Sequence, residues 1–319
     1  MQNQKIIIIC GPTGSGKSGI AMDLCRKYNG AMISADSRQV YSQMDIGTGK
    51  ELPQDGFEIK KKKDRYIVNG IDVYGYDIVK PNEEFSVSIF EDKVFKEYLP
   101  KILAQGKIPF LVGGTGFYIK SIIDGIETAN IPPDSILRNK LEKLFQEKGV
   151  GALWQELEKI DVKKAQSIDA QNPRRIIRAI EIAKAQKNEI PLKPKNIRNF
   201  EPLFIGINWE RKALYNRVDK RVDKMFEQGL ILEISNLLHQ GYSWDLSALN
   251  TIGYIELKPF FEEKALLSSC VERLKFSTHA YIRRQLTWFN KDKRIRWFVL
   301  DNSFLFVEMI AYIDYFMSK

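Results

Sequence analysis

The feature that most constrains this chain is the stretch 6–18, where an apolar run leads into a glycine-rich loop and then into a helical pattern. The loop reads Gly11-Pro12-Thr13-Gly14-Ser15-Gly16-Lys17-Ser18, a complete G-x-x-x-x-G-K-S motif. Glycines let such a loop turn its N–H groups towards one point, and the following helix N-terminus adds partial positive charge. We therefore predict a strand–loop–helix unit whose loop 11–18 binds a diphosphate or triphosphate.

Two side chains at the end of this motif predict how the phosphate charge is neutralised. Lys17 supplies a mobile cation, and the hydroxyl of Ser18 is placed to coordinate a bound Mg²⁺ ion. The alternative is a glycine-rich turn that matches by chance, which the flanking strand and helix patterns argue against. We therefore expect Mg²⁺ as the cofactor, with Ser18 as a ligand.

Length and charge limit the class of protein. The chain has 319 residues, with 49 Lys and Arg against 40 Asp and Glu, which gives a formal charge of +9. The length predicts two domains or one domain with an insertion. The charge on a phosphate-binding chain favours a polyanionic partner such as nucleic acid, although an ordinary basic enzyme would also carry it.

The cysteines and the apolar runs indicate the compartment. Cys10, Cys25 and Cys270 are isolated and no C-x-x-C pair occurs, which argues against a disulfide framework and a zinc site. This usage favours a reducing compartment, so we expect a cytoplasmic protein. No apolar run approaches membrane-spanning length, so we expect neither a membrane partner nor a signal peptide.

Polar residues that follow two further strands are candidates for the same site. The pattern predicts a second buried strand over 31–35, ending at Asp36, and a third over 108–112, ending in a glycine-rich turn around Thr115. Ligands of open α/β sheets bind outside the carboxyl ends of the strands, so both residues should face the loop 11–18. Asp36 could bind Mg²⁺, hold a hydroxyl or accept a proton, or it could merely cap a turn.

Two loops near these strands narrow the function further. The third strand ends in Gly113-Gly114-Thr115-Gly116 and not in the aspartate that a P-loop ATPase uses for Mg²⁺, which favours a transferase over a motor. The loop 44–50 is polar and glycine-spaced. Its Thr48 and Lys50 could reach an anionic ligand, or the loop could be a plain surface turn.

The middle of the chain follows a different pattern from its two ends. Residues 126–198 predict several helices, one of them beginning at Asn172-Pro173, and residues 203–209 return to a buried strand. We predict an α/β fold, with a P-loop NTPase-like parallel sheet flanked by helices. The catalytic core would comprise 1–125 and 199–319, and 126–198 would form an all-helical insertion domain.

Arginines gather at three places in the predicted helices. Arg174, Arg175 and Arg178 begin a helix of the insertion, where they suit a nucleic-acid backbone or simply a solvated face. Arg217 and Arg221 lie four residues apart and could clamp a diphosphate or pair with nearby carboxylates. The predicted helix 268–289 mixes arginines with large aromatics, which suits an unstacked base, although the aromatics could also be core.

Taken in order, these motifs resemble those of the tRNA dimethylallyltransferases (tRNA isopentenyltransferases) of bacterial type, over nearly the whole chain. The resemblance rests on the loop 11–18 together with Ser34-Ala35-Asp36-Ser37-Arg38-Gln39-Val40-Tyr41, Met44-Asp45-Ile46-Gly47-Thr48-Gly49-Lys50, Val112-Gly113-Gly114-Thr115-Gly116, Asn172-Pro173-Arg174-Arg175 and Arg283-Arg284-Gln285-Leu286-Thr287-Trp288. A P-loop alone is common to many families, but this combination in this order is specific.

The resemblance implies transfer of a dimethylallyl group from dimethylallyl diphosphate to N6 of the adenosine just 3′ of the anticodon of tRNA. Asp36 would accept the N6 proton, Thr13 would contact the leaving oxygen, and Lys17 and Arg221 would help to hold the diphosphate on the loop 11–18. The implied contacts to the anticodon stem-loop are Asp36, Ser37, Arg38, Gln39, Thr115, Arg138, Gln171, Asn172, Pro173, Arg174, Arg175, Arg283, Arg284, Gln285, Thr287 and Trp288.

Two departures from the family pattern concern tRNA docking and leave the chemistry intact. The surroundings of Gly253-Tyr254 lack the usual flanking basic residues, and the turn 73–75 lacks the usual histidine. We expect a monomer. The competing hypotheses are a small-molecule kinase that uses ATP at the same loop and an RNA-binding regulator without turnover, but the basic insertion and the arginine–aromatic helix are features that a small-molecule kinase does not need.

Overall fold

The computed structural model describes residues 4–125, 131, 134–187, 200–300 and 305–319. The chain divides into two compact units, Met1–Ile123 with Asn199–Lys319, and Asp124–Arg198. We call them the core unit and the helical unit. The sequence placed the two junctions after residues 125 and 198, which is within two residues of this division.

The core unit is built on one mixed sheet. Its strands are β1 (Gln4–Cys10), β2 (Gly30–Ser34), β3 (Ile59–Lys61), β4 (Tyr66–Val68), β5 (Ile71–Tyr74), β6 (Ile108–Gly113), β7 (Phe200–Asn208) and β8 (Arg296–Val299). Their spatial order is β3-β4-β5-β2-β6-β1-β7-β8. All neighbours from β5 to β8 pair in parallel, and β3, β4 and β5 pair antiparallel. The prediction of a mostly parallel sheet flanked by helices is confirmed.

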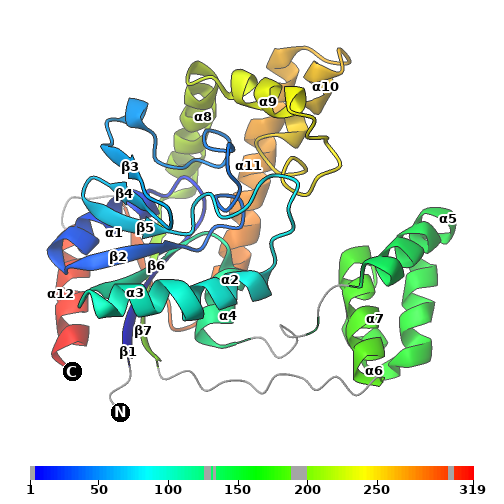
Figure 1. The fold of residues 1–319 in the computed structure, drawn as a ribbon, viewed down its shortest axis with the longest axis horizontal. Helices are drawn as coiled ribbons and strands as arrows, with labels where there is room; N and C mark the ends of the chain where they lie inside the picture. Colours follow the sequence, from blue (N-terminus) through cyan, green and yellow to red (C-terminus); the bar gives the residue numbers. More distant parts are fainter. Residues whose placement is uncertain (1–3, 126–130, 132–133, 188–199, 301–304) are drawn as a thin grey trace. The chain divides into compact units, whose positions relative to one another are not determined.

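Helices cover both faces of this sheet (Figure 1). One face carries α1 (Lys17–Lys27) and α12 (Leu305–Ser318), and the other carries α2 (Val87–Lys93), the π-helical turn η2 (Val94–Tyr98), α3 (Leu99–Ala104) and α4 (Gly116–Ile123). Ile7 and Ile9 of β1 pack into the first layer, and Ile6 and Ile8 into the second. Because both faces are covered, the strand reads as a continuous apolar run.

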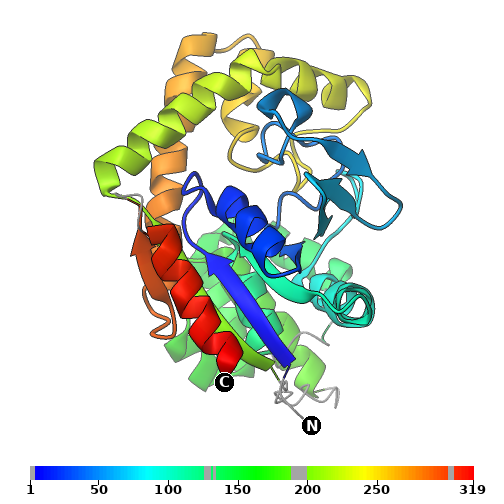
Figure 2. The same cartoon turned by 90° about the vertical axis from the view of Figure 1, so that its left-hand side faces the viewer.

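A further group of helices lies beyond the carboxyl ends of the strands. They are α8 (Arg211–Glu227), α9 (Leu230–His239), α10 (Lys258–Phe261) and α11 (Leu267–Phe289). Val40 and Met44, in the connection after β2, are buried in one apolar cluster with Leu230 and Leu274 from these helices. Figure 2 shows β1 (dark blue) pointing towards this group, so the loop that follows β1 lies between the sheet and the helices.

The helical unit has a core of its own, formed by α5 (Ser135–Ile160), α6 (Val162–Ser167) and α7 (Pro173–Lys187). Gly149 interrupts α5 with φ 76° and ψ −178°, a backbone conformation that glycine adopts without strain. Asn172 caps α7 by accepting a hydrogen bond from the N–H of Arg175, at 3.2 Å. Among the described residues, no helix is both long and apolar enough to cross a membrane.

The hairpin in the core unit also follows its turn chemistry. β4 and β5 are joined by Asn69 and Gly70, whose φ values of 48° and 82° match a two-residue turn of the kind that Asn-Gly favours. On the other face of the sheet, α2, η2 and α3 follow one another without a break over 87–104, and the chain loosens into the π-turn η2 before Pro100 enters the first turn of α3.

Candidate active site

The loop 11–18 adopts a backbone that only glycine tolerates at several positions. Gly11, Gly14 and Gly16 have φ values of 142°, 75° and 88°. A Cβ atom at Gly14 would lie 2.3 Å from Cγ1 of Val218 on α8, and one at Gly11 would lie 2.2 Å from the carbonyl oxygen of Ile207. The glycines therefore supply both the left-handed conformation and the close approach of the loop to α8 and β7.

Three side chains hold the carbonyl groups of this loop. Lys17 donates through Nζ to the carbonyl of Pro12 at 2.6 Å, Arg217 through Nε to that of Gly14 at 3.0 Å, and Trp209 through Nε1 to that of Ser15 at 3.0 Å. The first N–H groups of α1 have no carbonyl four residues earlier within the helix, so they are available to a ligand. The sequence predicted Lys17 and Arg217 near this loop but did not reveal Trp209.

A cavity of about 540 Å³ opens in front of the loop, and we call it the phosphate cavity. Its cations come from the loop 11–18, from the loop 44–50 and from α8: Lys17, Lys50, Arg217, Lys220, Arg221 and Lys224. Part of its wall is apolar, with Met32, Leu52, Phe57, Val112 and Met225. The cavity therefore offers an anion-binding end of backbone amides and cations beside a surface that suits a small hydrocarbon group.

Lys17 belongs to the loop itself, and its surroundings shift its pKa in opposite directions. Burial lowers the pKa of Lys17 to about 8, and the Arg221 guanidinium adds to the lowering, while Asp36 works to raise it. The lysine is thus easily deprotonated at moderately alkaline pH in the absence of an anion. A bound diphosphate would stabilise its charged form.

A second cavity of about 530 Å³ lies next to the phosphate cavity, and the residues that line both are Thr13, Asp36, Thr48, Arg221 and Met225. The second cavity is otherwise lined by residues that include Arg38, Gly253, Tyr281 and Arg284. The shared residues therefore lie where a ligand in one cavity would meet a ligand in the other. They include the three residues to which the family resemblance assigns the reacting groups, Thr13, Asp36 and Arg221.

Asp36 is held in place by its own backbone turn and faces both cavities. Its Oδ1 accepts a hydrogen bond from the N–H of Arg38 at 2.9 Å, which fixes the side chain at the end of β2. Thr115, at the end of β6, accepts from the N–H of Ser37 at 3.1 Å through its hydroxyl oxygen. The two strand ends are thereby joined, as their parallel pairing predicts.

Arg221 lies against the backbone of Gly49. A Cβ atom at Gly49 would be 1.5 Å from Nη2 of Arg221, and Gly49 has φ 67°, so only glycine fits beneath the guanidinium. Burial lowers the pKa of Arg221, and the carboxylates of Glu51 and Asp36 oppose this effect. Two carboxylates near these arginines in the sequence have other partners. Asp219 accepts a hydrogen bond from His279 at 2.8 Å, and Glu210 accepts one from the N–H of Ala213 at 3.1 Å.

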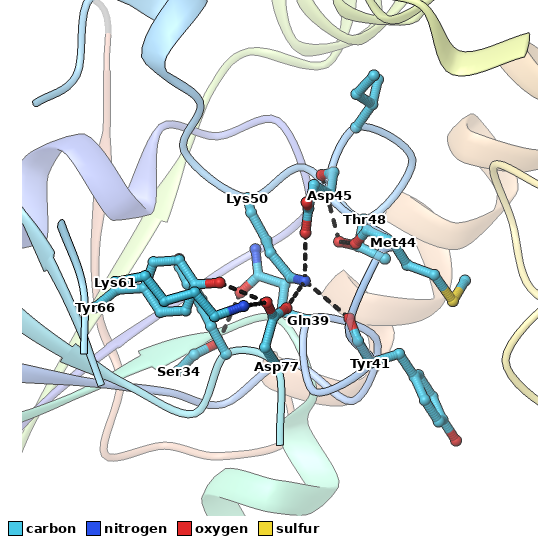
Figure 3. Close-up of polar contacts among 12 residues, drawn as sticks. Ser34, Gln39, Tyr41, Met44, Asp45, Thr48, Lys50, Lys61, Tyr66 and Asp77 are labelled. Carbon is cyan, nitrogen blue, oxygen red and sulfur yellow. Dashed lines mark hydrogen bonds and ion pairs between the residues drawn. The ribbon is translucent and has the colours of Figure 1, made fainter. Parts of the chain in front are cut away.

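The loop 44–50 has a structural role that its sequence did not reveal (Figure 3). Lys50 is buried, and its ammonium donates to the carbonyl of Tyr41 at 2.8 Å, to Asp45 at 2.7 Å and to Asp77. Thr48 donates its hydroxyl to the carbonyl of Met44. The loop is therefore not a plain surface turn. Lys50 also lines the phosphate cavity, but carboxylates inside the protein already neutralise its charge, so its contact with an anionic ligand stays a prediction.

The same loop is held from its other side by Glu233 of α9. This carboxylate accepts hydrogen bonds from three consecutive N–H groups, those of Asp45, Ile46 and Gly47, at 2.8, 2.7 and 3.1 Å. It also accepts from the hydroxyl of Tyr254 at 2.7 Å. With Lys50 and Glu233 holding it from two sides, the loop forms a fixed support for Gly49 and hence for Arg221.

The residues predicted to contact tRNA differ in how they are held. The exposed ones are Gln171, Arg174, Arg175, Arg283, Arg284, Thr287 and Trp288. The partly buried ones are Asp36, Ser37, Arg38, Thr115, Arg138, Asn172 and Pro173, and the buried ones are Gln39 and Gln285. Arg138 is bound to the buried carboxylate of Glu181 through Nε at 2.7 Å and Nη2 at 3.1 Å. Gln39 accepts from the hydroxyl of Ser34 at 2.7 Å and donates to the carbonyl of Gly49 at 3.2 Å.

The metal prediction depends on one hydroxyl. Ser18 lines the phosphate cavity, and across the described residues no group of three or more His, Cys, Asp or Glu side chains could hold a metal ion. Mg²⁺ commonly takes most of its ligands from substrate phosphates and water, with one or two from protein. A serine hydroxyl with the carboxylate of Asp36 in the same cavity fits that mode of binding.

Fold and site together define a P-loop protein with an anion cavity and an adjoining second cavity that meet at a carboxylate. The family model described as IPP transferase matches residues 39–292, and the chain belongs to this family. The tRNA dimethylallyltransferase of Carboxydothermus hydrogenoformans is 39% identical over 93% of this chain and 92% of its own length. That of Acetivibrio thermocellus is 38% identical over 98% and 97%.

Solved structures agree with these relatives. The full-length tRNA isopentenylpyrophosphate transferase of Bacillus halodurans is similar with a TM-score of 0.69 at 35% identity, over 99% of this chain and 96% of that chain. A eukaryotic dimethylallyltransferase acting on tRNA is similar with a TM-score of 0.68 at 29% identity, over 90% of this chain and 70% of that chain. The expected family is therefore confirmed.

Proposed function

We propose that this chain transfers a dimethylallyl group from dimethylallyl diphosphate to N6 of the adenosine just 3′ of the anticodon in tRNA. The observation that carries the proposal is the meeting of the two cavities at Thr13, Asp36 and Arg221, in a member of the IPP transferase family. One cavity suits the isoprenoid diphosphate and the other suits a base that has left its stack. The proposed action takes place in the cytoplasm on a single subunit.

The loop 11–18 and the cations of α8 would bind the diphosphate. The α1 amides and Lys17 would neutralise its charge, which makes diphosphate a better leaving group. Thr13 and Arg221, shared by both cavities, would lie nearest the oxygen that leaves. The apolar wall with Met32, Phe57 and Val112 would take the five-carbon chain.

Asp36 would act as the general base. The N6 lone pair forms the new bond to the allylic carbon, the bond from that carbon to the diphosphate oxygen breaks, and its electron pair stays with diphosphate. An exocyclic amine is a weak nucleophile, so removal of its proton by a positioned carboxylate assists the attack. The proton passes to Asp36, and the products are the N6-alkylated adenosine and diphosphate.

Mg²⁺ is proposed as the cofactor, with Ser18 as the ligand from the loop and Asp36 as the nearest carboxylate in the same cavity. When bound, the ion would add positive charge at the diphosphate oxygens. The residues of the chain would still perform the binding and the proton transfer described above.

Exposed cations of both units would bind the tRNA backbone. The adenosine must leave its stack to reach Asp36, and unstacking a loop base costs less than unpairing a base within a duplex. Arg284 and Tyr281, in the wall of the second cavity, would contact the extruded base or its phosphate. Aromatic and arginine side chains are the groups that proteins use to stack unpaired RNA bases.

The test is incubation with radiolabelled dimethylallyl diphosphate and unmodified tRNA, set beside a parallel reaction with labelled ATP. Label retained on tRNA, and mapped to the adenosine 3′ of the anticodon, is the expected result. Transfer of label from ATP instead would indicate a kinase. Tight tRNA binding without any transfer would indicate an RNA-binding regulator.

A further inference from the structure

Gln285 on α11 was expected to contact tRNA, but its side chain is turned into the protein. It is 6% exposed, whereas Arg284 and Trp288 on the same helix are exposed. Its Oε1 accepts a hydrogen bond from the N–H of Thr13 at 2.8 Å, and its Nε2 donates to the carbonyl of Gly114 at 2.9 Å. Both ends of the amide are therefore engaged by the backbone of the phosphate site.

The backbone around Gly114 is shaped to receive this side chain. A Cβ atom at Gly114 would lie 2.3 Å from Nε2 of Gln285, so an alanine there would displace the amide. At Gly116, a Cβ atom would lie 2.2 Å from Cδ1 and from Nε1 of Trp288. The helix α11 thus fits against the turn after β6 at two points, and both depend on glycine.

The hydrogen bond from Thr13 also decides which amides of the loop remain for a ligand. The N–H of Thr13 is engaged by Gln285, and that of Ser15 donates to the carbonyl of Pro12 at 3.3 Å. Gln285 thus fixes the backbone of Thr13, a residue that lines both cavities.

Gln285 also lies close to the boundary between the two cavities. Tyr281, one turn earlier on α11, lies in the wall of the second cavity, while Gln285 lines the phosphate cavity. A single side chain thus contacts the loop 11–18 and the turn after β6, one helical turn from a residue that lines the second cavity.

From these contacts we propose that Gln285 is a positioning residue for the diphosphate and not a tRNA contact: it fixes the backbone of Thr13 and ties α11 to the phosphate site. The proposal rests on the proposed function for the identity of the diphosphate substrate. The contact itself can be measured without turnover, so the two can fail separately.

The first experiment measures the contact directly. In the whole chain labelled with ¹⁵N-threonine, the N–H of Thr13 should exchange with solvent at least about tenfold faster in Gln285→Met than in the unaltered protein, because removal of one hydrogen bond is worth about that factor. Methionine has a similar length and volume but provides neither donor nor strong acceptor. Equal exchange rates would overturn the proposal.

The second experiment measures binding of each substrate by calorimetry, with inorganic diphosphate and with unmodified tRNA as probes. Gln285→Met should weaken diphosphate binding by about tenfold and leave tRNA binding within about twofold. Arg284→Gln, from the exposed side of the same helix, should do the reverse. Weakened tRNA binding with unchanged diphosphate binding in Gln285→Met would restore the tRNA-contact role and overturn the proposal.

Gly114→Ala reaches the same contact from the other side, and it keeps the proposal testable if Gln285→Met does not fold. It should displace the amide and weaken diphosphate binding in a similar way. Where both variants fold, the double variant should be no weaker than the weaker single variant, because both remove one interaction. Additive effects would show that the two residues act independently and would contradict the proposal.

Discussion

The core unit and the helical unit both carry arginines that the proposed function assigns to phosphate binding, but they hold them in different ways. In the core unit, Arg217 donates to the carbonyl of Gly14, and Arg221 occupies the space where Gly49 has no side chain. In the helical unit, Arg174 and Arg175 stand exposed on the first turn of α7. A compact diphosphate needs charges at fixed positions, whereas an RNA backbone repeats its charge and tolerates a looser arrangement.

Arg138 shows an intermediate arrangement within the helical unit. Its guanidinium is held on two sides by Glu181, whose carboxylate is buried and also accepts from Arg178 at 3.0 Å. Such a pair fixes the direction of the arginine and lowers its effective charge. The helical unit therefore combines arginines oriented by Glu181 with exposed ones, and the predicted tRNA contacts there should differ in how much they depend on salt.

The largest effect is expected at the carboxylate that the core unit places between its cavities. Asp36→Asn should lower kcat by about 10²–10⁴-fold, because asparagine keeps the hydrogen bond from Arg38 but cannot accept a proton. Binding of tRNA and diphosphate should be preserved. Single-turnover kinetics at saturating tRNA measure the chemistry, and calorimetry at several Mg²⁺ concentrations measures the binding.

The outcome of this test also separates the roles considered for Asp36. Unchanged chemistry would remove the general-base assignment. A defect that excess Mg²⁺ corrects would make Asp36 a metal ligand, since the carboxylate charge would then matter more than proton transfer.

The next largest effect is expected at Gly49, and it tests whether activity depends on the position of the Arg221 guanidinium. Gly49→Ala should lower kcat/KM by about 10²-fold, because the new Cβ would occupy the position of Arg221 Nη2 and displace a charge by an ångström or more. No catalytic atom is removed. The measurement is steady-state kinetics with dimethylallyl diphosphate and tRNA.

Gly56→Ala is the matched control for this prediction. Gly56 also has a positive φ, 85°, but nothing lies within 4 Å of the position of its Cβ. It therefore reproduces the backbone strain without the displacement, and its kcat/KM should stay close to that of the unaltered protein. Equal reductions in the two variants would mean that strain, and not the position of Arg221, limits activity.

How far the sequence predicted this molecule depends on whether a feature is local. The loop 11–18, the strand end at Asp36 and the helix start at Asn172-Pro173 each follow from residues that are adjacent in the chain, and all are confirmed in position. The hydrogen bond from the N–H of Thr13 to Gln285 was not predictable in this way, because the two residues are separated by 272 positions.

The same reason explains why the sequence did not reveal the buried ion pairs of Lys50. A lysine in a polar, glycine-spaced loop looks available to a ligand, and its partner Asp77 lies 27 positions away behind the Asn-Gly hairpin. Burial works to raise the pKa of Asp77, but Lys50 and Lys61 override it and hold the pKa below its usual range. Such a buried network depends on tertiary packing, which a single sequence does not display.

A smaller effect is expected for the pH dependence of diphosphate binding at the loop 11–18. Lys17 has a pKa of about 8, so it is charged below that pH and neutral above it in the free protein. Diphosphate prefers the charged lysine, so binding above pH 8 takes up a proton and weakens by about tenfold per pH unit. Calorimetry with inorganic diphosphate, from about pH 7 to about pH 9.5, measures this decline.

Lys17→Arg is the control, because arginine keeps its charge throughout this range. Its diphosphate affinity should be lower than that of the unaltered protein at neutral pH, since the guanidinium has a different shape, but flat with pH. A decline of the same steepness in both proteins would assign the titration to another group.

The smallest effect concerns the exposed arginines of the helical unit. Replacement of Arg174 and Arg175 by alanine should weaken tRNA binding only a few-fold at moderate salt, because each arginine meets one phosphate among many along the backbone. The plot of log affinity against log salt should become shallower by about 0.7–0.9 for each phosphate that is no longer neutralised, since fewer counterions are released. Arg26→Ala, which removes an exposed arginine on α1 that pairs with Asp23 at 2.9 Å, changes the net charge without touching the proposed contacts. Its slope should match that of the unaltered protein; if both variants shift the slope equally, net charge and not local contact governs tRNA binding by this unit.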